Sequence, residues 1–155
     1  MGDRSVTRNC GPDLVRVGAG LPVAAYRDEI TTALHGGRAV IVAPPGTGKT
    51  TFVPPLVASR CSGRVIVTQP RRVAARAAAR RLATLTGTRP GEFASHTVHG
   101  ESTTTRDTKV EFVTTGVLLR RLLSDPDLTG VDAVVLDEVH ERHLDADLVV
   151  AMVCE

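Results

Sequence analysis

The chain has 155 residues, about the size of one domain, and 42% of them are hydrophobic, which is enough for a packed core and excludes a disordered protein. Its net charge of +2 is too small to indicate a polyanionic partner by itself, although arginines gather within 71–81 and acidic residues within 125–147. The three cysteines are far apart and form no C-x-x-C pair, and no apolar run approaches the length of a membrane span. We therefore expect a cytoplasmic protein with reduced thiols, no structural zinc and no membrane partner.

The N-terminal part of the chain contains the first predicted elements. Residues 1–20 are rich in glycine, and we expect a mostly irregular leader there. Apolar residues four apart within 24–34 predict a helix, which the glycines after His35 would end. The short apolar run 38–42 is typical of a buried parallel strand.

The segment 43–50 reads APPGTGKT and separates this strand from a predicted helix, which is the setting of a phosphate-binding loop. Glycines let consecutive backbone N–H groups turn inward around an anion, and the helix start adds partial positive charge. The Lys49 ammonium would reach the β- and γ-phosphates, and the Thr50 hydroxyl would hold Mg²⁺. The usual loop begins with glycine, whereas this one begins with Ala43. The alternative is a chance glycine-rich turn.

The elements after the loop predict an α/β fold. The helix after the loop contains Pro54 and Pro55 and should be short or kinked, and 64–68 is a second buried strand. Two strands joined by a helix-length crossover form a βαβ unit, which implies a parallel sheet. A helix to about Leu85 follows, with arginines on one face that a solvated surface would also explain. Further strands are expected at 93–98, 109–113 and 131–136, and further helices at 116–123 and 146–154.

An acidic pair follows the last predicted strand. Four apolar residues precede Asp137 and would carry its carboxylate to the C-terminal edge of the sheet, within reach of Mg²⁺. Glu138 could then orient or deprotonate an attacking water. The alternative is a solvated acidic turn. His140 and His143 are three residues apart with the acid between them, which does not match the H-E-x-x-H zinc helix.

Several motifs occur in the order found in the DEAH/RHA branch of superfamily 2 helicases. Residues 137–140 read DEVH and resemble the DExH box, while 70–75 (PRRVAA) and 114–119 (TTGVLL) are similar to two further motifs of that branch. The continuation 141–144 (ERHL) most resembles the bacterial HrpB type, whereas Gln69 is closer to the HrpA type. The resemblance runs from about Leu21 to the end, and this superfamily often has alanine at the first position of the loop.

The resemblance implies a fold, a set of ligands and a role for each matching residue. The fold would be a P-loop NTPase with a RecA-like, mainly parallel sheet and helices on both faces, residues 21–155 forming the first such domain. The ligands would be ATP, Mg²⁺ and single-stranded nucleic acid, RNA rather than DNA. ATP would contact Pro45, Gly46, Thr47, Gly48, Lys49, Thr50, Thr51 and, through adenine stacking, Arg81. Thr50 and Asp137 would hold the metal, Glu138 would activate water, and Lys49 would assist catalysis at the phosphates. His140 would couple the nucleotide site to the nucleic-acid site. The residues that would contact nucleic acid are Arg71, Arg72, Thr114 and Gly116.

The resemblance also implies parts that the sequence lacks. Family members carry a Ser/Thr-Ala-Thr motif after the DExH box and then, in the same chain, a second RecA-like domain with arginine fingers. The strand that ends in that third motif lies between the loop strand and the DExH strand, so 38–42 and 131–136 would face a gap. We therefore expect a fold that is incomplete at its C-terminus and an isolated chain that is inactive. Two alternatives remain: a different P-loop enzyme such as a small-molecule kinase, and a non-enzymatic remnant that binds nucleotide weakly.

Overall fold

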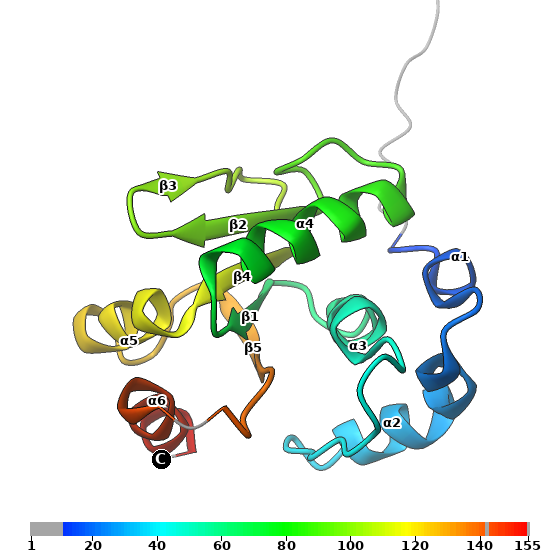
Figure 1. Ribbon diagram of the computed structural model, residues 1–155, viewed down its shortest axis with the longest axis horizontal. Coiled ribbons are helices and arrows are strands. Elements are labelled where there is room, and N and C mark those ends of the chain that lie inside the picture. The colour runs from blue at the N-terminus through cyan, green and yellow to red at the C-terminus, as the bar shows by residue number, and fades with distance from the viewer. Residues whose placement is uncertain (1–10, 142, 155) are drawn as a thin grey trace, which may run out of the picture.

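The computed structural model describes residues 11–141 and 143–154, and over these residues it forms one five-stranded sheet in the order β3-β2-β4-β1-β5 (Figure 1). In chain order the strands are β1 (Arg64–Gln69), β2 (Ala94–Val98), β3 (Glu101–Ser102), β4 (Val110–Thr114) and β5 (Val131–Leu136). β1 pairs in parallel with β4 and with β5, β2 pairs in parallel with β4, and only the short β3 is antiparallel to its neighbour. The predicted mainly parallel sheet is confirmed.

Helices cover both faces of the sheet, as predicted. The helices are α1 (Leu14–Gly18), the 3₁₀ turn η1 (Pro22–Tyr26), α2 (Arg27–Leu34), α3 (Lys49–Ala58), α4 (Arg72–Thr86), α5 (Thr115–Ser124) and α6 (Leu144–Cys154). Side chains of β1 alternate between two apolar clusters. Val65 and Val67 pack with α1, α3 and α4, whereas Ile66 packs with α5 and α6. Figure 1 shows α5 and α6 to the left of β1 and β5, with α1 and α3 to the right.

Local sequence explains where α3 and α4 begin and end. α4 starts after Arg71, whose backbone is extended, and stops at Gly87, whose left-handed φ of 69° suits a residue without a Cβ. α3 contains Pro54 and Pro55 and has 10 residues, in keeping with the short helix that these prolines predict. α4 is therefore present with nearly the predicted ends, and α3 is the short helix that was predicted.

The expectation of an irregular leader is wrong for its last part. Asp13 caps α1 by accepting hydrogen bonds from the N–H groups of Val15 and Arg16, both at 3.1 Å. Leu14 and Val17 are buried in the main core, so tertiary packing stabilises a helix of only five residues. Residues 1–10 of the predicted leader lie outside the described residues, and the domain boundary at Leu21 stays a prediction.

The predicted strand 38–42 is absent. These residues form no ladder, and Val40 and Val42 are each 91% exposed, while Ile41 packs against the main core. A strand is stabilised by hydrogen bonds to a neighbour. Among the described residues the sheet ends at β5, which contains no fully buried residue and pairs along one edge only. The segment thus has the sequence of a buried strand without the partner that would make it one.

α6 begins at Leu144, two residues before the predicted start of the helix 146–154, and Asp145 lies inside its first turn. Across the part of the chain that the structure describes, every helix is too short or too polar to cross a lipid bilayer.

Candidate nucleotide and nucleic-acid site

The predicted phosphate-binding loop, 43–50, has a backbone that only glycine adopts easily at two positions. Gly46 and Gly48 have φ values of 77° and 90°. A Cβ on Gly46 would meet open space, whereas one on Gly48 would approach the Leu21 side chain to 2.9 Å. The Thr47 carbonyl accepts a hydrogen bond from the Val23 N–H at 3.0 Å. The Thr47 hydroxyl donates to the Pro44 carbonyl at 2.9 Å. The loop is therefore anchored to η1 and open at Gly46.

Positive charge and free backbone donors meet at this loop. The Lys49 ammonium donates to the carbonyls of Ala43 at 2.6 Å and Pro44 at 3.0 Å, so it lies over the first residues of the loop. Lys49 is also the first residue of α3. The Thr51 N–H in its first turn donates to the Gly48 carbonyl at 3.1 Å, so this helix start offers the N–H groups of Lys49 and Thr50 to a ligand. An ammonium beside a glycine loop at a helix start is the donor set that a triphosphate requires, and these residues fit one.

Asp137 lies beside the loop, directly after β5. Its Oδ2 accepts a hydrogen bond from the Thr50 hydroxyl at 2.5 Å, and its Oδ1 accepts one from the Glu138 N–H at 3.0 Å. The two predicted metal ligands, Thr50 and Asp137, are thus brought together from positions far apart in the chain. A hydroxyl and a carboxylate oxygen that converge on one point fit Mg²⁺, which prefers oxygen ligands.

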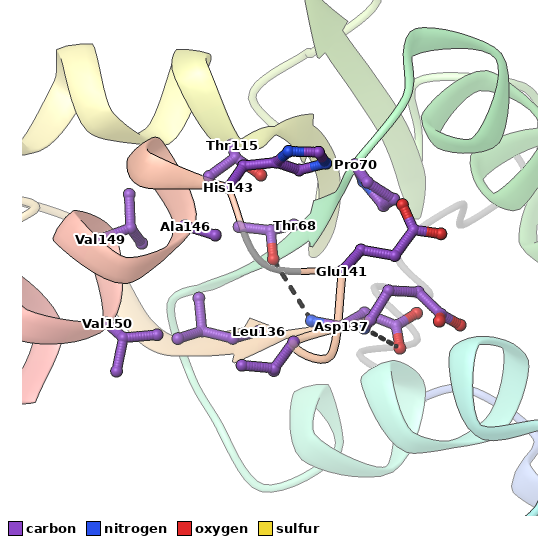
Figure 2. Close-up of a pocket in the computed structure, with 12 residues that line it drawn as sticks. Thr68, Pro70, Thr115, Leu136, Asp137, Glu141, His143, Ala146, Val149 and Val150 are labelled. Atoms are coloured by element: carbon purple, nitrogen blue, oxygen red, sulfur yellow. Dashed lines mark hydrogen bonds between the residues drawn. The ribbon is translucent and has the colours of Figure 1, made fainter.

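The acidic turn after Asp137 brings three further polar groups together. The Glu138 carboxylate lies 3.2 Å from Nε2 of His140, and one ligand atom from each of Glu138, His140 and Glu141 lies within 4.8 Å of the other two. Glu138 has a φ of 54°, a left-handed conformation that is strained for a residue with a Cβ. A cavity of about 20 Å³, room for a single water, lies between this turn and α6 (Figure 2).

The four predicted nucleic-acid residues gather at the same edge of the sheet. Thr114 ends β4 directly before α5, and Gly116 is in the first turn of that helix. Arg71 and Arg72 are exposed at the start of α4. β1 and β4 are neighbours, with Gln69 opposite Thr114, so the two helix starts lie side by side. Their contact with nucleic acid stays a prediction.

Two arginines of α4 differ in their surroundings. Arg81 is exposed and forms no ion pair among the described residues, and it lies about 14 Å along the helix from Arg72 at 1.5 Å per residue. Its predicted stacking on adenine stays a prediction. Arg76 pairs with Glu101, whose other oxygen lies 2.7 Å from Nε2 of His96. The arginine face of α4 is therefore not purely solvated, because Arg76 binds the β2–β3 hairpin.

A buried carboxylate connects that hairpin to α5. Glu111 of β4 is fully buried and accepts two hydrogen bonds from Arg121, at 2.6 and 2.8 Å, with further ones from Thr97 at 2.6 Å and Thr104 at 3.0 Å. Burial by itself would raise the pKa of Glu111. The hydrogen bonds from Arg121, Thr97 and Thr104 and the charge of Arg121 outweigh burial and lower this pKa from 4.5 to about 2. The carboxylate is thus ionised wherever the fold is intact at neutral pH.

Two residues at the end of β1 belong to the site although sequence reasoning assigned them no role. The Gln69 side-chain amide donates to Oδ2 of Asp137 at 2.7 Å. The Thr68 hydroxyl accepts a hydrogen bond from the Asp137 N–H at 3.3 Å, as the dashed line in Figure 2 shows. Strand order is the signal that could have found them, because parallel neighbours end at the same edge of a sheet.

Comparison with known families agrees with this geometry. The family model described as DEAD/DEAH box helicase matches residues 26–147, well over half of the chain. The chain belongs to the DEAD/DEAH box helicase family. The sequence of this chain is 41% identical over 138 residues to that of the ATP-dependent RNA helicase HrpB of Escherichia coli, and the alignment covers 87% of this chain and 17% of HrpB. It is 35% identical to the ATP-dependent RNA helicase HrpA of Borreliella burgdorferi, covering 86% of this chain and 17% of HrpA.

A solved structure gives the same result for the fold of this helicase chain. The crystal structure of the Escherichia coli DEAH/RHA helicase HrpB matches it with a TM-score of 0.83 at 40% identity, covering 87% of this chain and 18% of that one. The predicted helicase resemblance and RecA-like fold are confirmed. Membership of the helicase family removes the small-molecule kinase alternative. The chain spans less than a fifth of the length of these relatives.

Proposed function

We propose that this chain binds and hydrolyses ATP as the first RecA-like domain of a nucleic-acid-dependent DExH-box helicase, and that the nucleic acid is RNA. The observation that carries the proposal is the contact between Thr50 of the loop helix and Asp137 at the end of β5. It joins the two halves of a metal-nucleotide site at the edge where nucleotides bind in open α/β sheets. RNA is preferred over DNA because HrpB and HrpA are both named RNA helicases.

The loop and Lys49 bind the triphosphate in this proposal. The Lys49 ammonium leaves the carbonyls of Ala43 and Pro44 and moves to the β- and γ-phosphates. Its hydrogen bonds to the charged phosphate oxygens are stronger than those to neutral carbonyls. Backbone N–H groups around Gly46 and Gly48 and at the start of α3 surround the remaining phosphate oxygens. Pro45, Thr47 and Thr51 lie within the same segment and shape it.

Hydrolysis requires a metal site and a base. Thr50 and Asp137 would hold Mg²⁺, which supplies charge neutralisation on the phosphate oxygens. Glu138 is the next residue and would accept the proton of the attacking water. His140 lies 3.2 Å from the Glu138 carboxylate and would link this base to the segment that follows the DExH box.

Nucleic acid would bind across the starts of α4 and α5. Both helix N-termini present free N–H groups and partial positive charge to a phosphate backbone, and Arg71 and Arg72 add full charges. Because these contacts involve the backbone, they would carry little sequence preference. A second RecA-like domain in the same protein would complete the ATP site, in keeping with the small share of HrpB that the chain covers. We place the protein in the cytoplasm, where the free thiols of Cys61 and Cys154 would stay reduced.

Binding of a fluorescent ATP analogue tests this proposal, with the chain fused to a soluble carrier protein. Lys49→Ala should weaken Mg²⁺-dependent binding by about 2–3 kcal/mol, the worth of charge-assisted hydrogen bonds. Lys109→Ala is the matched control, because Lys109 also donates to a backbone carbonyl, that of Ser62 at 2.6 Å, but lies outside the loop. Equal affinity in both variants contradicts the site. A wild-type chain that binds no nucleotide favours the alternative of a non-enzymatic remnant.

A further inference from the structure

The end of β1 contains a glutamine to which the proposed mechanism gives no part. Gln69 is 4% exposed and is the last residue of the strand. Its Nε2 donates to Oδ2 of Asp137 at 2.7 Å, the same oxygen that accepts from the Thr50 hydroxyl at 2.5 Å. The Asp137 main chain is held as well, by the Thr68 hydroxyl. The strand end therefore fixes both the backbone and the side chain of Asp137.

The chemistry of an amide suits this place. The Thr50 hydroxyl can turn its hydrogen away from Asp137 when its oxygen faces a cation, whereas the Gln69 amide remains a donor at every pH. The amide carries no charge, so it orients the carboxylate without competing with the cation that the carboxylate would hold. Groups of this kind fix the direction of a ligand oxygen and typically influence metal affinity strongly.

The position of β1 gives the contact a second consequence. β1 lies between β5, which carries Asp137, and β4, in which Thr114 stands opposite Gln69. The two residues that follow Pro70 are Arg71 and Arg72 at the start of α4. One rigid strand end thus contacts the carboxylate of the metal site and leads directly into the nucleic-acid segment.

We propose that Gln69 is a positioning residue that directs Oδ2 of Asp137 towards Thr50 for metal binding and attaches this carboxylate to the start of α4. The inference rests on the proposed function of Thr50 and Asp137 as metal ligands. A purely structural glutamine would instead satisfy its own buried amide, and its loss would lower fold stability without acting through Asp137. The two cases differ in what happens when Asp137 is itself changed.

The test is a double-mutant cycle read as the Mg²⁺ dependence of binding of a fluorescent ATP analogue. Gln69→Met keeps an unbranched side chain of similar length but removes the amide. It should raise the Mg²⁺ concentration at half-maximal binding roughly ten- to a hundredfold, the usual effect of losing a partner of a metal ligand, and leave metal-free nucleotide affinity unchanged. In an Asp137→Asn background the same change should have no further effect, because it acts through that carboxylate.

Two further variants keep the inference falsifiable. Gln69→Asn retains the amide on a shorter side chain and should behave like Gln69→Met even if the latter folds poorly. Ser95→Ala removes a buried hydrogen bond of β2, to Thr104 at 3.1 Å, and should leave the Mg²⁺ midpoint unchanged. The inference about Gln69 is overturned, without affecting the proposed metal site, by an unshifted Mg²⁺ midpoint in both Gln69 variants. It is also overturned if Gln69→Met shifts the midpoint as much in the Asp137→Asn background as in the wild type. Nucleotide binding by the wild-type chain without any Mg²⁺ dependence overturns the proposed metal site as well.

Discussion

The buried Glu111 should make the stability of this chain depend on pH below about 4.5. The pKa of Glu111 is lowered from 4.5 to about 2 in the folded chain. A depressed pKa means that the folded state favours the ionised form, so the stabilisation is fully present above pH 4.5 and is lost as pH falls from there to about 2. At 1.36 kcal/mol per pKa unit, the stabilisation at neutral pH is about 3 kcal/mol.

Replacement of the charge tests this magnitude. Glu111→Gln keeps the shape of the side chain but leaves the Arg121 guanidinium, which is 32% exposed, without its counterion. We expect a loss of about 3 kcal/mol in the free energy of unfolding at pH 7, the lower end of the range for breaking a buried ion pair. The loss should shrink between pH 4.5 and 2, because the Glu111 carboxylate of the unfolded wild-type chain takes up a proton there while that of the folded chain stays ionised until about pH 2.

Urea unfolding followed by circular dichroism at several pH values measures both quantities. Glu101→Gln is the control, since Glu101 is 43% exposed and also lies in an ion pair. Comparing each variant with the wild type at each pH separates Glu111 from the other carboxylates. A Glu111→Gln chain that unfolds at the wild-type urea concentration at pH 7 would refute the argument. So would a difference that is the same at pH 7 and at pH 3.

Three further outcomes are expected. In a protein that also contains the second RecA-like domain, the Glu138→Gln variant should bind ATP normally, while its rate of ATP hydrolysis in a steady-state assay falls by roughly two to four orders of magnitude. A normal rate would mean that another residue is the base. Replacing Arg71 and Arg72 with alanine should reduce the slope of log affinity for single-stranded RNA against log salt concentration by the equivalent of up to about two phosphate contacts. An unaltered slope would mean that both arginines are only solvent-exposed surface residues. The 155-residue chain without a carrier should be poorly soluble and hydrolyse ATP negligibly, because 38–42 and one edge of β5 have no strand partner among the described residues. A cooperative calorimetric melt together with RNA-stimulated ATPase activity would contradict this last expectation.

Elements with a complete local signal were predictable from the sequence. α4 has helical periodicity and ends at Gly87, and β1 is a β-branched run between turn residues, so neither depends on distant residues for its recognition. The loop and Asp137 were found for the same reason, since each follows a recognisable apolar run. Thr50 and Asp137 do meet, at 2.5 Å, although 38–42 forms no strand in the structure.

The errors have non-local causes. Residues 38–42 have a strand sequence, but a strand forms only beside a partner, and no periodicity reports whether a partner exists. α1 is too short for propensity to predict, and the burial of Leu14 and Val17 stabilises it. Gln69 was overlooked because its hydrogen bond joins residues 68 positions apart, and only the order β1-β5 places them together.

The left-handed backbone of Glu138 means that selection for stability alone would favour replacing this residue. A glycine at this position would remove strain on the order of 1 kcal/mol, because the conformation with φ 54° is unfavourable only for residues with a Cβ. The same exchange would delete the proposed base. A laboratory screen that rewards heat resistance alone would therefore enrich a variant that lacks the carboxylate we propose as the base of ATP hydrolysis.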